Sequence, residues 1–253
     1  MKVLSLSCQK DYQSSLGPFL RSVLTNGVYD FLLLQEATEP VLAHVRNVSS
    51  YQVLTATDAV IGKQSLLSIV YRKNIPLVAH TVQSFAGMRF DPVAGYKHLG
   101  FGVLGAIFEY EGGKRCFGSI HLHAGIDPAV RARELPYVKD RILDLGAELP
   151  VIVGGDFNFG YPWELSRASR ILGPELICET SLLGGTLDSR YSELVDHLPN
   201  KIAHALARIG VGIKLKTDHF FANHAATEFK SVLCRVLPDR VSDHSPIELV
   251  TQN

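Results

Sequence analysis

Short apolar segments with the length of β-strands alternate along this chain with segments of helical periodicity. The apolar segments are rich in β-branched residues and end at turn-forming residues, so we expect strands at 3–8, 30–34, 66–72, 77–85, 101–110, 115–122, 151–153, 218–222, 228–236 and 246–250. Helical spacing of apolar residues predicts helices at 16–25, 39–48, 128–145 and 162–172, the last two beginning at a proline. This alternation predicts a mixed α/β protein.

The turn at 110–114 (Tyr-Glu-Gly-Gly-Lys) joins two expected strands with no helix between them. Paired glycines tolerate the positive φ angles of a tight reversal, so the turn predicts an antiparallel hairpin. The sequence contains no internal repeat, low-complexity tract or linker-like segment. Its 253 residues, 46% of them hydrophobic, are enough to bury a large core, and we expect a single domain spanning residues 1–253.

Charge and cysteine content restrict the environment and the partners of the protein. Lys plus Arg and Asp plus Glu both number 25, which disfavours tight non-specific binding of nucleic acid. The cysteines at positions 8, 116, 178 and 234 form no zinc-binding pair or dense disulfide framework and are expected to be reduced core thiols. The first apolar run is too short for a signal peptide, and no run approaches the roughly 20 residues of a spanning helix. We therefore expect a cytoplasmic protein with no membrane-spanning segment; protein partners stay unknown.

The strongest local motif is the segment 151–158, Val-Ile-Val-Gly-Gly-Asp-Phe-Asn. An apolar strand runs into two glycines and then into Asp156 and Asn158, and the i, i+2 spacing directs both side chains to one side of an extended segment. A carboxylate orients and deprotonates a water molecule, while an amide holds that water or a phosphate oxygen without adding negative charge. A structural role, with Asp156 capping a turn that Asn158 closes, describes most Gly-Asp sequences met at random.

Polar residues follow apolar strands at further places, at Glu36, His121, Asp218, Asp243 and His244. Each alone has a structural explanation: a first-turn helix acid, a core histidine, a cap, or a turn before a proline-led strand. Together with the 151–158 motif they supply at least three carboxylates, two histidines and an amide, which is the set of a hard-cation site with its proton-transfer groups. Magnesium suits this set better than zinc, because the chain offers no HxxxH or CxxC spacing.

The order of these motifs resembles that of the endonuclease/exonuclease/phosphatase superfamily, which includes exonuclease III and deoxyribonuclease I. The resemblance rests on the segments 32–36, 119–122, 155–158, 217–218 and 242–244, and it spans nearly the whole chain. It implies a four-layered α/β sandwich, in which two packed mixed β-sheets are flanked by helices.

The resemblance also implies a role for each matched residue. Glu36 would bind the catalytic Mg²⁺, with Mn²⁺ as a substitute, and Asp243 would assist metal binding or orientation. Asp156 would activate the attacking water, with Asn158 beside it.

On the phosphate side, the resemblance implies that His244 contacts the scissile phosphate while Asp218 keeps that histidine cationic and correctly turned. His121 would be a second phosphate-side histidine. Thr186 and Asp188 resemble a T-x-D segment that precedes the matched Asp218 strand in the family, a weaker correspondence.

Two positions depart from the family pattern. Ser7 stands where the family has asparagine, so it keeps a hydroxyl near the metal or phosphate but loses the amide. His219 stands where the family has an aromatic residue; we interpret it as a solvated edge residue in preference to an extra substrate contact.

The implied reaction is hydrolysis of a phosphoester by in-line attack of water, with Mg²⁺ and the histidines stabilising the developing charge. We favour a phosphodiesterase or nuclease. Two alternatives stay open: a phosphatase or phosphodiesterase acting on a lipid or small-molecule head group, and a non-catalytic binding module that keeps the scaffold. The expected substrate partner is accordingly nucleic acid, a phosphorylated small molecule or a lipid head group.

Substrate choice is expected to depend on the loops around the site, for which the candidates are 85–99 and 186–216. Within the second, apolar residues at helical spacing predict a helix at 194–209, which we interpret as ordinary core packing in preference to a lid. A basic cluster on the expected helix 128–145 comprises Arg131, Arg133, Lys139 and Arg141. We interpret this cluster as a solvated helix face, because the neutral net charge disfavours an extended polynucleotide groove.

Overall fold

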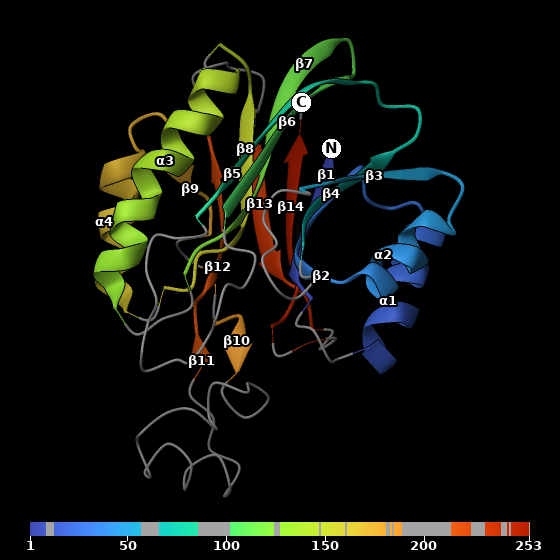
Figure 1. The fold of residues 1–253 in the computed structure, drawn as a ribbon, viewed down its shortest axis with the longest axis horizontal. Helices are drawn as coiled ribbons and strands as arrows, with labels where there is room; N and C mark the ends of the chain where they lie inside the picture. The colour runs from blue at the N-terminus through green and yellow to red at the C-terminus, as the bar shows by residue number, and fades with distance from the viewer. Residues whose placement is uncertain are drawn as a thin grey trace, which may run out of the picture.

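Two six-stranded mixed β-sheets pack face to face, and two helices cover the outer face of each sheet (Figure 1). This four-layered α/β sandwich confirms the fold class expected from the sequence. The computed structural model describes residues 1–8, 13–56, 66–85, 102–123, 127–146, 148–159, 161–180, 183, 185–188, 214–223, 231–238, 242 and 244–252.

The first sheet has the strand order β13-β14-β1-β2-β4-β3. Its strands are β13 (Ser231–Val236), β14 (Ile247–Gln252), β1 (Lys2–Ser7), β2 (Phe31–Ala37), β4 (Leu66–Arg72) and β3 (Tyr51–Thr55). β1 runs parallel to β2 and antiparallel to β14, so the sheet is mixed. Helices α1 (Gln13–Thr25) and α2 (Glu39–Arg46) lie on its outer face.

The second sheet has the strand order β5-β6-β7-β8-β12-β9. Its strands are β5 (Leu77–Ser84), β6 (Gly102–Tyr110), β7 (Gly113–His121), β8 (Val151–Asp156), β12 (Asp218–Ala222) and β9 (Ile177–Cys178). β7 and β8 are parallel, joined through helix α3 (Pro128–Gly146), and helix α4 (Pro162–Leu172) follows β8. A separate small ladder pairs β10 (Leu187–Asp188) with β11 (Lys214–Leu215).

The period-2 alternation of each strand divides the apolar side chains between three core layers. In β2, Phe31 and Leu33 face the second sheet, whereas Leu32 and Leu34 face α1 and α2. Across the central layer the Phe31 ring stacks on the Phe117 ring of β7, with centroids 3.9 Å apart. Both faces of the central strands are therefore buried, which explains their nearly continuous apolar sequences.

The two glycines of the 151–158 motif allow close packing at the site end of β8. A Cβ atom added at Gly154 would lie 2.4 Å from the Phe220 ring and 2.9 Å from the Leu33 side chain. A Cβ atom added at Gly155 would lie 1.9 Å from the Ile120 carbonyl oxygen. Larger residues would separate β8 from its neighbours, so the glycines keep the end of β8 in position.

The structure confirms the four expected helices and the hairpin between β6 and β7. It adds four strands that the sequence did not predict, namely β3, β9, β10 and β11. The expected helix 194–209 and most of the loop 85–99 fall outside the described residues. All four cysteines are free thiols; Cys8 and Cys116 are buried, whereas Cys178 and Cys234 are half-buried. Among the described residues, no helix is both long and apolar enough to cross a membrane.

Candidate active site

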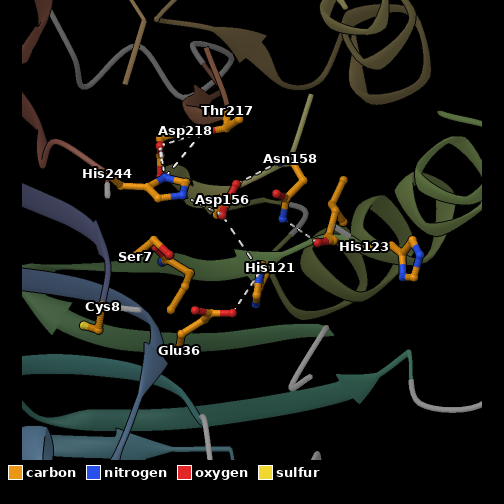
Figure 2. A network of polar contacts seen from close by, with 12 residues as sticks. Ser7, Cys8, Glu36, His121, His123, Asp156, Asn158, Thr217, Asp218 and His244 are labelled. Carbon is orange, nitrogen blue, oxygen red and sulfur yellow. Dashed lines mark hydrogen bonds and ion pairs between the residues drawn. The ribbon is translucent and has the colours of Figure 1, made fainter. Parts of the chain in front are cut away.

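The predicted site residues meet where strands of both sheets end or begin (Figure 2). Parallel strands place their carboxyl ends at the same edge of a sheet, and an antiparallel neighbour begins there. β2, β7 and β8 therefore contribute the residues at or near their carboxyl ends, while β12 contributes its first residue and the chain enters β14 from the same edge. The side chains brought together are Glu36, His121, Asp156, Asp218 and His244.

Asp218 and His244 form the shortest contact of the site. The His244 Nδ1 atom lies 2.7 Å from Asp218 Oδ2, and both side chains are buried. The Thr217 hydroxyl donates a second hydrogen bond to the same carboxylate oxygen, over 3.0 Å. These bonds fix the rotation of the imidazole ring and leave its Nε2 atom directed towards Asp156 (Figure 2).

Asp156 lies between the two histidines. Its Oδ2 atom is 3.6 Å from His244 Nε2 and 3.8 Å from His121 Nε2. His121 Nε2 is in turn 4.0 Å from Glu36 Oε1, so acids and histidines alternate from Asp218 to Glu36. In this arrangement each imidazole has a nitrogen atom within 4.0 Å of each of two carboxylates.

The electrostatics of the two aspartates differ although both are buried. Burial raises the pKa of Asp156 well above its usual value, and the negative charges of Asp218 and Glu36 act in the same direction. Burial by itself would also raise the pKa of Asp218, but the charge and hydrogen bond of His244 hold that pKa below its usual value. Asp156 is therefore the carboxylate that accepts a proton more readily, and Asp218 is the permanent anion.

Asn158 is at the site, but not on an extended segment as the sequence suggested. β8 ends at Asp156, and Asn158 has a left-handed backbone with φ 52°. Its backbone N–H donates to Asp156 Oδ1 over 2.9 Å, and its side-chain Nδ2 donates to the Leu122 carbonyl oxygen over 2.8 Å. Asn158 thus holds the Asp156 carboxylate and ties the segments after β7 and β8 together.

Thr186 supports the segment that carries Asp218. Its hydroxyl oxygen accepts the backbone N–H groups of Thr217 and Asp218, over 3.2 Å and 3.1 Å. The backbone of Asp188 lies in β10, paired with β11. Thr186 therefore holds the start of β12, while the T-x-D correspondence stays a prediction.

Ser7 and Ser242 join the first and last strands of the site. The Ser242 hydroxyl donates to the Ser7 carbonyl oxygen over 2.8 Å and accepts the backbone N–H of His244 over 3.0 Å. Ser7 is buried at the end of β1, beside Glu36 and His121 in Figure 2. Asp243 lies outside the described residues.

His219 is not a solvated edge residue, and that expectation is wrong. It is 1% exposed, its Nδ1 lies 2.9 Å from the Thr180 hydroxyl, and its Nε2 lies 3.1 Å from the Lys216 carbonyl oxygen. Phe157 and Phe159 pack against its ring, and burial lowers its pKa to about 4. A neutral His219 therefore occupies the aromatic position of the family pattern as a core residue.

The interpretation of Arg131 as part of a solvated helix face is also wrong. Arg131 is 2% exposed and forms a bidentate ion pair with Glu164 of α4, over 2.8 Å and 3.1 Å. Its remaining nitrogen donates to the His123 carbonyl oxygen over 3.2 Å, and Glu134 accepts the His123 backbone N–H over 3.0 Å. Sequence reasoning missed this network because its charged partners lie far apart in the chain.

The donor chemistry of the site fits a hard divalent cation. Asp156, Asp218 and His244 offer ligand atoms within 4.8 Å of one another, and Glu36 adds a carboxylate that is 14% exposed. Asp218 is already engaged by His244 and Thr217, so Glu36 and Asp156 are the acids with oxygen atoms directed at the shared space (Figure 2). Oxygen donors of this kind match Mg²⁺ or Mn²⁺.

A family model described as the endonuclease/exonuclease/phosphatase family matches residues 14–244 of the chain. The chain belongs to this family. The match includes Glu36, His121, Asp156, Asp218 and His244. Membership in this endonuclease/exonuclease/phosphatase family identifies the protein as an enzyme that acts on phosphoesters. Among curated proteins, no match to the chain is found.

Solved structures of this family share the fold over the full chain. D. rerio TDP2 humanized by 14 mutations is 17% identical with a TM-score of 0.75, covering 100% of this chain and 99% of that chain. D. rerio TDP2 complexed with single strand DNA product is 16% identical with a TM-score of 0.75, covering 98% and 97%. The Bacteroides thetaiotaomicron VPI-5482 mannosyl-6-phosphatase Bt3783 is 16% identical with a TM-score of 0.71, covering 100% of both chains. At these identities the likeness establishes the fold.

Proposed function

We propose that this protein is a Mg²⁺-dependent phosphodiesterase that cleaves its substrate by in-line attack of water. The observation that carries the proposal is the position of Asp156, whose Oδ2 lies 3.6 Å and 3.8 Å from the Nε2 atoms of two histidines. In this arrangement the base activates a water molecule, and the two imidazole N–H groups stabilise charge on a phosphoryl group in the same small space.

Each side chain of the site has a distinct part in this proposal. Asp156 Oδ2 orients the attacking water and takes its proton, because burial makes this carboxylate more basic than usual. His244 donates from Nε2 to a phosphate oxygen while Asp218 holds the ring at Nδ1. His121 approaches the phosphate from the Glu36 side. Asn158 fixes Asp156 through its backbone N–H.

We assign the metal to Glu36, with Asp243 contributing from the segment between Ser242 and His244. A bound Mg²⁺ would neutralise negative charge on the phosphoryl group and stabilise the charge that develops on the leaving oxygen. Mn²⁺ meets the same oxygen donors. The buried Ser7 hydroxyl, next to Glu36 in Figure 2, replaces the family's amide as an auxiliary polar group.

The charges of the chain favour a short strand or a small phosphodiester as substrate over a long nucleic acid duplex. Two members of the basic cluster that sequence analysis singled out are engaged within the protein, since Arg131 pairs with Glu164 and Lys139 with Glu175. A short nucleic acid strand or a small phosphodiester needs fewer phosphate contacts than a long duplex. The TDP2 structure with single strand DNA product and the mannosyl-6-phosphatase make a DNA strand and a sugar phosphate the first substrates to compare. The four free thiols support a reducing, cytoplasmic location.

The test compares hydrolysis of bis-p-nitrophenyl phosphate, p-nitrophenyl phosphate, single-stranded DNA and mannose 6-phosphate with Mg²⁺, Mn²⁺ or EDTA. We expect metal-dependent cleavage of the diesters, reduced at least about 100-fold in Asp156→Asn because the base is removed. Asp140→Asn, an exposed carboxylate on α3, is the matched control and should keep full activity. Equal turnover by wild type and Asp156→Asn would contradict the proposal, and a strong preference for the monoesters would identify a phosphatase.

A further inference from the structure

Two large aromatic side chains stand exposed at the start of α4. Tyr161 and Trp163 are each 49% exposed, and their rings are nearly parallel, with centroids 5.8 Å apart and an interplanar angle of 14°. Trp163 is the single tryptophan of the chain. Unlike a single exposed ring, two adjacent parallel rings form a contiguous flat apolar surface, and aromatic rings favour stacked contacts with other flat ring systems.

The backbone at Tyr161 is anchored to a buried ion pair. The backbone N–H of Tyr161 donates to Glu164 Oε2 over 3.0 Å. Glu164 is itself 3% exposed, and both of its carboxylate oxygens accept hydrogen bonds from Arg131. The exposed rings therefore project from an anchored backbone, which lowers the backbone entropy lost when a ligand binds to them.

The same support connects the aromatic pair to the active site. Arg131 also donates to the His123 carbonyl oxygen, two residues beyond His121. Along the chain, Tyr161 follows Asn158 by three residues, so their Cα atoms are at most about 11 Å apart. A nucleotide whose phosphate lies at Asp156 spans a distance of this order.

We propose that Tyr161 and Trp163 form a stacking platform for a nucleobase of a single-stranded nucleotide substrate, next to the scissile phosphate; this inference rests on the proposed phosphodiesterase function. A base stacks on an aromatic side chain through its flat face, whatever its sequence identity, and this contact supplies affinity without positive charge. That property fits a chain with equal numbers of acidic and basic residues, in which Arg131, Lys139 and Arg141 are engaged by Glu164, Glu175 and Gln83.

The test uses two phosphodiesters with the same leaving group, thymidine 5′-p-nitrophenyl phosphate and methyl p-nitrophenyl phosphate, of which only the first carries a base. We expect wild type to prefer the thymidine ester, measured as a ratio of kcat/KM values. In Trp163→Ala this ratio should fall about tenfold or more, mainly through KM, and Trp163→Phe should restore most of it. Tyr137→Ala removes an aromatic residue of similar exposure (45%) from the middle of α3 and should leave the ratio unchanged.

A second measurement separates the platform from catalysis. In Asp156→Asn, the fluorescence of Trp163 should be quenched by thymidine 5′-monophosphate and unaffected by deoxyribose 5-phosphate. An unchanged ester ratio in Trp163→Ala, or equal quenching by the two phosphates, would overturn the platform even if both esters are hydrolysed. Base-dependent quenching without hydrolysis of either ester by wild type would instead support the platform and contradict the proposed phosphodiesterase. Absence of both signals would reject both.

Discussion

Asp218 is placed to act on the reaction through His244 and not on the substrate itself. Its carboxylate accepts hydrogen bonds from His244 Nδ1 over 2.7 Å and from the Thr217 hydroxyl over 3.0 Å, while His244 Nε2 faces Asp156. An asparagine has nearly the same shape but cannot balance an imidazolium charge. The contribution of this residue is therefore mostly electrostatic.

For Asp218→Asn we expect kcat to fall about 100-fold or more, because His244 loses the anion that stabilises its protonated form. The basic limb of the pH-rate profile should move to lower pH for the same reason. Steady-state kinetics on bis-p-nitrophenyl phosphate between pH 5 and 9 would measure both effects. A variant with wild-type kcat and an unmoved profile would show that Asp218 is only a packing residue.

Glu134 makes stability depend on pH in a defined direction. Burial raises its pKa to about 7 from an ordinary value of 4.5, although the His123 N–H and the charge of Arg131 oppose the shift. Between these two pH values the folded protein holds a proton that the unfolded chain has released. The free energy of unfolding therefore falls as pH rises through this window, and the loss persists above it.

Replacing Glu134 with glutamine removes this titration but keeps an oxygen acceptor for the His123 N–H. Relative to wild type, Glu134→Gln should be more stable at pH 8 than at pH 5 by up to roughly 3 kcal/mol. Urea unfolding of both proteins at the two pH values measures the difference. A difference that does not change with pH would mean that Glu134 titrates normally in the folded state.

At the scale of elements, the buried pair Arg131–Glu164 joins helices α3 and α4. Removing one partner leaves an uncompensated charge in the protein interior, so Arg131→Ala should lose about 3–5 kcal/mol of unfolding free energy. Arg133→Ala changes an exposed residue two positions away on the same helix and should stay within about 0.5 kcal/mol of wild type. Denaturant titrations compare the two variants, and equal stabilities would contradict a structural role for the pair.

The sequence predicted the elements whose signals are local. α4 was expected at 162–172 and is found at Pro162–Leu172, because a proline at its first position and Gly173 after its end are local features. β9, β10 and β11 have two residues each, too few to show any periodicity. β3 lies at the edge of its sheet and mixes Gln and Thr with its apolar residues, which weakens its strand pattern.

Contacts between distant parts of the chain explain the residues that were misjudged. The partner of Arg131 follows 33 residues later, and that of His219 precedes it by 39. Periodicity within a helix or strand contains no information on such partners, so both residues looked like ordinary surface positions. The residues that meet at the candidate site were singled out because they lie at or near the ends of strands, a pattern that is visible locally, and because their order resembles that of a known family.

At the scale of the whole molecule, one apolar layer joins the two sheets. It includes Phe31 and Ile69 of the first sheet and Phe117, Ile152 and Phe220 of the second. Neither sheet keeps its inner face buried without the other, so we propose that residues 1–253 form a single domain. We expect one cooperative thermal transition, with equal calorimetric and van't Hoff enthalpies. Two separate transitions would indicate two independently stable units.

The pairing of β1 with β14 has a consequence for synthesis on the ribosome. Lys2 pairs with Val250, and His244 enters the site just before β14 begins. At about 5–20 residues per second, roughly 12–50 s separate the translation of these two strands. During that interval one side of β1 has no hydrogen-bonding partner from β14, which makes the nascent chain a candidate for chaperone binding.

The same order delays activity until residue 244 has been translated. A nascent chain that ends before residue 244 carries Asp156 and Asp218 but not the histidine between them, so chains stalled there should hydrolyse no phosphodiester, whereas the released protein should. An enzyme proposed to cut nucleotide strands is thereby kept inactive while the ribosome translates its first 243 residues.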